Sequence, residues 1–160
     1  MRLIRRLALF ALGLMIVAAS PEARAIDAVS VRSDAPAIDL TAVLDHQRSE
    51  ADRIQVSTAP GTDGIVRRIE VRAREGGQNW VVFALANNTD DQLDRLIVAP
   101  HYRIVSSGLL WPDLGLSRIA TITPSVGDRP ERQESATADI FRITLDPGSV
   151  VTFVAELRTD

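Results

Sequence analysis

Two short stretches carry the residues that are best suited to bind a ligand. The first reads His101-Tyr102-Arg103, and the second reads Leu110-Trp111-Pro112-Asp113. An aromatic ring beside a proline and a carboxylate can cover the apolar face of a sugar or another small molecule, while arginine and aspartate fix its hydroxyls or charges. We therefore predict a shallow binding platform made of His101, Tyr102, Arg103, Trp111 and Asp113. The alternative is that Trp111 closes an open end of the domain and Tyr102 packs beside it.

The sequence shows no recognisable catalytic constellation. The two histidines, His46 and His101, lack the short spacing of metal ligands. No serine lies in a Gly-x-Ser-x-Gly elbow, and the lack of cysteine excludes thiolate metal sites and cysteine nucleophiles. We expect no catalytic residue, no metal site and no cofactor. One alternative stays open, a hydrolase-like or metal-dependent enzyme that uses His101 with loop carboxylates, which are Asp113, Asp128, Glu131, Glu134 and Asp139.

Alternating apolar and polar residues predict the strands that must position these side chains. Residues 69–73 alternate in this way, which is typical of a strand with one face in the core of an antiparallel sheet. Residues 80–86 are apolar on both faces and predict a central strand, with Trp80 in the core. Residues 141–145 and 151–157 alternate on either side of Asp146-Pro147-Gly148-Ser149, which predicts a hairpin.

The turn-forming residues that separate the other apolar stretches predict an all-β fold. Further strands are expected at residues 28–32, 54–58, 95–99, 102–106 and 118–122. Short strands at this spacing favour an antiparallel β-sandwich or jelly roll. After residue 25 the only plausible helix covers residues 41–53, where Thr41 would be the cap, and the alternative for that segment is a strand with a loop.

The N-terminal residues have the three parts of a secretory signal peptide. Arg2, Arg5 and Arg6 precede an apolar run over residues 7–19, and Ala23-Arg24-Ala25 offers small residues for cleavage. The run is shorter than the roughly 20 residues of a membrane-spanning helix, so a cleaved signal is preferred over an uncleaved anchor. We predict a signal-peptide helix over residues 1–25 and a single β-sandwich domain over residues 26–160, located in the periplasm or secreted.

Export and charge exclude several classes of partner. Cleavage would remove four arginines and one glutamate, which moves the formal net charge from −3 to −6. An acidic domain is unsuited to bind nucleic acid or anionic lipid, because both are negatively charged. An exported domain also has no access to ATP or nicotinamide cofactors. Without cysteine, its stability must come from an apolar core.

Three segments resemble a known family when they are taken in order. They are residues 38–41 (IDLT), residues 79–89 (NWVVFALANNT) and residues 141–148 (FRITLDPG). This order resembles the extracytoplasmic sensor domains of membrane-bound bacterial signalling proteins. Such domains precede seven-helix receptors with diverse intracellular signalling modules, or the GGDEF and EAL domains of cyclic di-GMP proteins. The resemblance covers residues 38–158.

The resemblance implies a carbohydrate-binding-like jelly roll that senses a ligand and has no catalytic activity of its own. Its partner would be either an unknown small molecule, for which a saccharide-like compound is one candidate, or a periplasmic protein. The parent protein would lie in the inner membrane and would carry a cyclic di-GMP cyclase or phosphodiesterase, yet this sequence contains no GG-[DE]-[DE]-F or Glu-x-Leu motif. Contact with the membrane is expected only through a missing C-terminal continuation. A structural envelope β-sandwich remains a further alternative, beside the enzyme described above.

Overall fold

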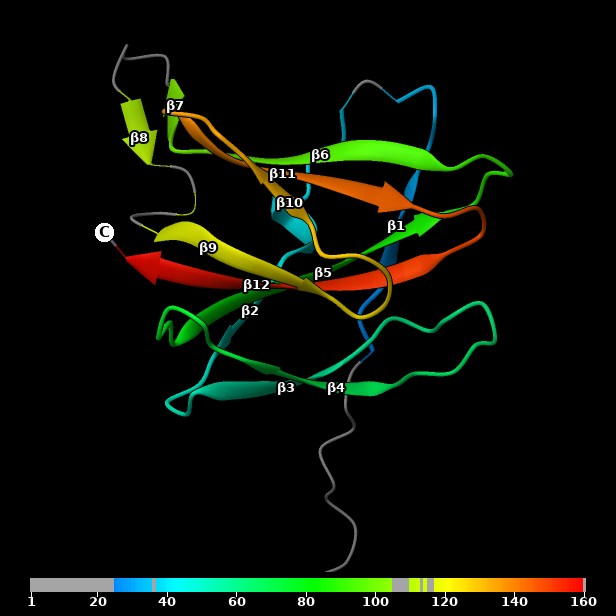
Figure 1. The fold of residues 1–160 in the computed structure, drawn as a ribbon, viewed down its shortest axis with the longest axis horizontal. Coiled ribbons are helices and arrows are strands. Elements are labelled where there is room, and N and C mark those ends of the chain that lie inside the picture. The colour runs from blue at the N-terminus through cyan, green and yellow to red at the C-terminus, as the bar shows by residue number, and fades with distance from the viewer. Residues whose placement is uncertain (1–24, 36, 105–109, 113, 115–116, 160) are drawn as a thin grey trace, which may run out of the picture.

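The chain is built almost entirely from β-strands (Figure 1). The structure is a computed structural model, and it describes residues 25–35, 37–104, 110–112, 114 and 117–159. The prediction of an all-β fold is confirmed. The strands are β1 (Ala28–Val31), β2 (Asp45–Arg48), β3 (Arg53–Ser57), β4 (Arg68–Arg72), β5 (Asn79–Asn87), β6 (Leu93–Pro100), β7 (Tyr102–Ile104), β8 (Leu110–Pro112), β9 (Ser117–Pro124), β10 (Glu131–Gln133), β11 (Ala138–Leu145) and β12 (Val150–Thr159).

Three layers lie one above another in Figure 1. The upper sheet has the strand order β10-β11-β6, and the central sheet has the order β1-β5-β12-β9. Strand β2 pairs with the first half of β5, and β1 pairs with its second half, so the two strands share one edge. The lower layer is the hairpin β3-β4, while β7 and β8 form a separate small ribbon.

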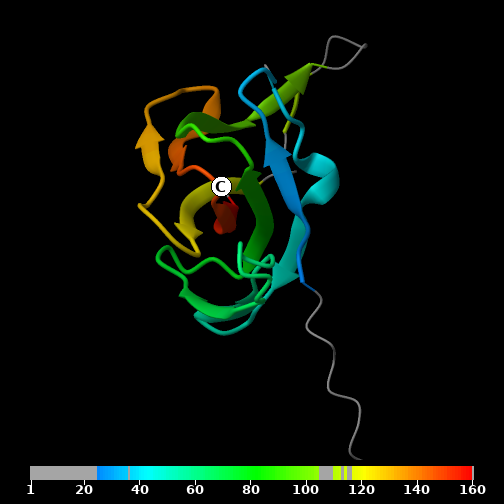
Figure 2. The ribbon, with the colours of Figure 1, turned by 90° about the vertical axis from the view of Figure 1, so that its right-hand side faces the viewer.

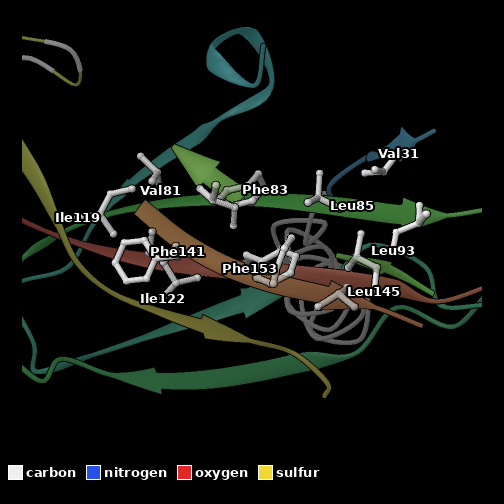
Figure 3. Packing of buried hydrophobic residues seen from close by; sticks show 14 of the residues in the cluster. Val31, Val81, Phe83, Leu85, Leu93, Ile119, Ile122, Phe141, Leu145 and Phe153 are labelled. Atoms are coloured by element: carbon white, nitrogen blue, oxygen red, sulfur yellow. The ribbon is translucent and has the colours of Figure 1, made fainter. Parts of the chain in front are cut away.

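The layering explains why β5 is apolar on both faces. Its odd-numbered side chains Val81, Phe83 and Leu85 point into the main core under the upper sheet, where the Phe83 and Phe153 rings stack at 5.4 Å (Figure 3). Its even-numbered side chain Trp80 packs in a second core against the lower hairpin. Trp80 is 1% exposed, so its predicted place in the core is confirmed.

The predicted hairpin around residues 146–149 is wrong. The turn itself forms, because the Ser149 N–H donates to the Asp146 carbonyl at 3.1 Å and Gly148 adopts a φ of 67°. However, β11 pairs with β6 and β10 in the upper sheet, whereas β12 pairs with β5 and β9 in the central sheet. The turn therefore carries the chain between sheets, which lets β12 bury both of its faces.

The segment predicted as a helix or a strand with a loop follows the second interpretation. A single 3-10 turn covers Thr41–Val43, and β2 follows it directly. Thr41 does not cap this turn; its backbone N–H instead donates to Asp39 Oδ1 at 2.9 Å. None of the described residues forms a helix that is long and apolar enough to cross a bilayer. The predicted signal peptide, apart from Ala25, lies outside the described residues.

Candidate functional site

The backbone brings together the two stretches of the predicted binding platform. Strands β7 and β8 run antiparallel, with Tyr102 opposite Pro112 and Arg103 opposite Trp111. The side chains of Tyr102, Arg103 and Trp111, and Asp113 as a whole, lie outside the described residues. The platform therefore stays a prediction.

His101, the fifth predicted platform residue, lies beside a buried carboxylate. Its Nε2 atom is 3.4 Å from Asp139 Oδ1, and its backbone N–H donates to the Thr137 carbonyl at 2.8 Å. Asp139 is 4% exposed and lies on β11. The structure thus links His101 to the inside of the sandwich, at the point where β6 ends and β7 begins.

Asp139 also fastens the upper sheet to the central sheet. Its Oδ2 accepts the Ile119 N–H of β9 at 2.9 Å, and its Oδ1 accepts Arg132 Nη2 at 2.6 Å. Arg132 Nη1 in turn donates to the carbonyls of Ile119 and Ala120, both at 3.1 Å. These bonds satisfy backbone groups of two sheets, which is a structural role. Nowhere in the described part of the chain do three His, Asp or Glu side chains cluster as metal ligands would.

A second buried carboxylate, Glu156 on β12, holds the turn between β4 and β5. It is 0% exposed. Its Oε2 accepts the N–H of Arg74 at 2.8 Å, and its Oε1 accepts those of Glu75 and Gly77 at 3.0 and 2.8 Å. Sequence reasoning missed this residue, although a glutamate at an apolar position of a central strand is a signal for a buried polar contact.

A cleft of about 820 Å³ opens between the upper and central sheets. Its lining includes residues of β6 and residues of the 37–44 segment that follows β1. Figure 2 shows the course of this segment, in cyan, beside β1 in blue. The inner wall reaches the main core and is apolar. It includes Val81 and Leu85 of β5, Ile119 of β9 and Ile143 of β11.

The cleft exists because the sandwich is not closed along β6. Among the described strands β6 pairs only with β11, and its other edge faces the cleft. Alternate side chains of β6, namely Leu93, Arg95, Ile97 and Ala99, are buried or half-buried and face inward. Leu96 and Val98 point the other way and are 57% and 50% exposed. Both residues stand where a polar face is expected, and both belong to the lining of the cleft.

Three arginines line the mouth of the cleft, and they differ in their partners. Arg32 pairs with Asp34 at 3.0 Å, and Arg142 pairs with Glu131 at 2.6 Å. Arg95 instead donates to two backbone carbonyls, those of Asp94 at 2.8 Å and Arg32 at 3.1 Å. The second of these bonds joins β6 to the residue that follows β1 across the open edge.

The chain was compared with protein-family models, curated proteins and solved structures, and none of them matches it.

Proposed function

We propose that this chain is a non-catalytic ligand-binding domain of the exported sensory type, and that the cleft between its two sheets is the ligand site. The observation that carries the proposal is the apolar cleft of about 820 Å³. Ligand sites are concave, predominantly apolar and roughly 300–1,000 Å³ in volume, with a few polar groups that orient the ligand. The cleft has this size, an apolar inner wall and charged groups at its mouth.

Burial of apolar surface in the open cleft would drive ligand binding. Ile38 lines the cleft and is 37% exposed, and its neighbour Ala37 on the same wall is also exposed, so an apolar ligand would displace water from both. Each square ångström of apolar surface removed from water contributes about 25 cal/mol. The core beneath is already packed, so binding needs no rearrangement of the sheets.

The sequence supports the placement of this domain outside the cytoplasm. Residues 1–25 have the pattern of a cleaved signal peptide, and residues 38–158 resemble extracytoplasmic sensor domains. On this proposal the domain is the periplasmic input module of a membrane-bound signalling protein of the cyclic di-GMP type, with a jelly-roll sandwich. Ligand binding in the cleft would be the event that such a module reports.

A neutral fluorescent probe tests the cleft without any charge requirement. The full chain is titrated with N-phenyl-1-naphthylamine, and saturable enhancement of its fluorescence is expected. Ala37→Trp, on the wall of the cleft, should abolish the saturable signal because the indole fills the site. Ala51→Trp is the matched control, since Ala51 is exposed and does not line the cleft. No saturable binding, or equal binding to both variants, would overturn the proposal.

A further inference from the structure

We infer that the ligand of the cleft is an anionic amphiphile, with an apolar chain against the inner wall and a carboxylate bound by Arg95. This inference rests on the proposed function, because it takes the cleft as the ligand site. It adds the chemical class of the ligand and the residue that selects it.

Arg95 faces the cleft from β6. The alternation of the strand puts it on the inward side together with Ile97 and Ala99, and it is half-buried. Its guanidinium donates to two neutral carbonyls, and no described carboxylate lies within ion-pair distance of it. A guanidinium has five N–H donors in a planar fork that matches a carboxylate. Arg95 therefore keeps donors and an uncompensated charge for an anion.

The other charged groups around the mouth are engaged or face elsewhere. Arg32 and Arg142 have carboxylate partners in Asp34 and Glu131. Asp94 lies on the outward face of β6, where it accepts the Thr144 hydroxyl at 2.6 Å. Asp39, which is also exposed, accepts a backbone N–H from Thr41. Asp39 and Asp94 also belong to the lining of the cleft. Of the three arginines in that lining, Arg95 is the one without a carboxylate partner among the described residues, which favours a negative head group.

The inner wall selects the other end of the ligand. Val81, Leu85, Ile119 and Ile143 offer no side-chain donor or acceptor. A polar group placed there would lose its hydrogen bonds to water without replacement, whereas an alkyl or aryl chain would lose none. Charge at the mouth and an apolar wall within together describe a carboxylate amphiphile.

The test compares three ligands that share one chain and differ in the head group. Octanoate, octanol and octylammonium compete with N-phenyl-1-naphthylamine for the full chain at pH 7. Octanoate should bind about tenfold more tightly than octanol, because a charge-assisted bond forms only with the anion. Arg95→Gln should reduce this preference to about twofold or less, and Arg95→Lys should keep part of it. Arg72→Gln is the control, since Arg72 is exposed on β4 in the lower layer.

The outcomes separate this inference from the proposed function. If octanol or octylammonium binds as tightly as octanoate, the carboxylate class is overturned while the cleft remains the site. If the preference survives in Arg95→Gln but is lost in Arg142→Gln, the role of Arg95 is overturned. If neither the probe nor any of the three ligands binds, both proposals fail. Should Arg95→Gln not fold, Arg95→Lys takes its place, and a preference for octanoate over octanol in that variant equal to that of the wild type would overturn the role of Arg95.

Discussion

Two buried carboxylates show how single residues hold this domain together. Asp139 accepts a backbone N–H from β9, and Glu156 accepts three from the turn between β4 and β5. A buried backbone N–H without a partner costs about as much as a lost hydrogen bond, so each carboxylate secures a segment that the strand ladders leave open. Both residues carry buried carboxyl groups, which are common in active sites, yet their partners here are structural.

The substitution Glu156→Gln should destabilise the fold. The amide keeps one acceptor but turns an NH₂ group toward backbone N–H donors, so the free energy of unfolding should fall by about 2 kcal/mol. Urea denaturation followed by circular dichroism measures this change. Glu70→Gln is the control, because Glu70 lies on the surface of β4 in a 3.5 Å pair with Arg53 and should change stability by less than about 1 kcal/mol. Equal effects of the two substitutions would contradict the role of Glu156.

Asp63 in the loop between β3 and β4 should titrate well below an ordinary aspartate. Hydrogen bonds from the Arg67 guanidinium and from the Ile65 N–H lower its pKa from 3.8 to about 2. Because the folded pKa is depressed, its contribution to stability is present above pH 4 and is lost as the pH falls through about 2. NMR titration of the Asp63 carboxyl measures the pKa, and Arg67→Gln should raise it toward 3.8. A wild-type midpoint near 3.8 would refute the pairing.

Among the elements, the turn between β4 and β5 depends on one close approach to β12. A Cβ atom at Gly77 would lie 2.6 Å from the Leu157 carbonyl oxygen and 2.8 Å from Glu156 Cγ. The φ of Gly77 is outside the left-handed region, so a glycine-to-alanine change without this contact would stabilise the chain by about 0.4–1 kcal/mol.

The sign of the change in unfolding free energy for Gly77→Ala should therefore test this close approach. We expect a loss of about 1–3 kcal/mol, because neither the carbonyl nor the buried Glu156 side chain can move away. Thermal unfolding of the variant beside the wild type gives the sign. A gain in Tm would show that the turn lies farther from β12 than the structure places it.

The strands follow from local sequence, whereas their pairing does not. Alternation in residues 69–73 and the apolar run over residues 80–86 identify β4 and β5, because a period of two depends only on which faces are buried. Residues 146–149 form the expected turn, but turn chemistry says nothing of which sheet each flanking strand joins. The hairpin prediction failed for this reason.

Less of the candidate site than of the fold could be predicted from the sequence. The pairing of β7 with β8 brings the backbones of the predicted platform together, but no local pattern announces the cleft. The cleft results from an unpaired edge of β6 that faces residues 37–44, and these segments are far apart in the chain.

At the scale of the whole molecule, three layers bury two cores and leave one edge open. The central sheet is covered on both faces, which accounts for the continuous burial of residues 80–87 and 151–157. The open edge of β6 would be prone to pairing with other chains, and the Arg95 guanidinium on the Asp94 carbonyl partly blocks it. One edge thus serves as both a weak point of the sandwich and its proposed binding site.

Export should remove the first 25 residues. When the full chain is produced in a bacterium with a periplasm, mass spectrometry of the periplasmic protein should find Ile26 as the first residue. The double substitution Ala23→Arg and Ala25→Arg should block cleavage, because signal peptidase accepts small residues at these positions. A periplasmic protein that still begins at Met1, or one cleaved equally well after both replacements, would contradict the predicted signal peptide.

Amide chemical shifts of the full chain, recorded during titration with octanoate, show whether the ligand occupies the cleft. We expect saturable changes that concentrate on residues 37–44 and 94–100 and on Ile143, which line the cleft. The lower hairpin β3-β4 should stay unchanged, since it lies on the far side of the central sheet. Changes that centre on β7 and β8, or no saturable change at all, would contradict the cleft as the ligand site.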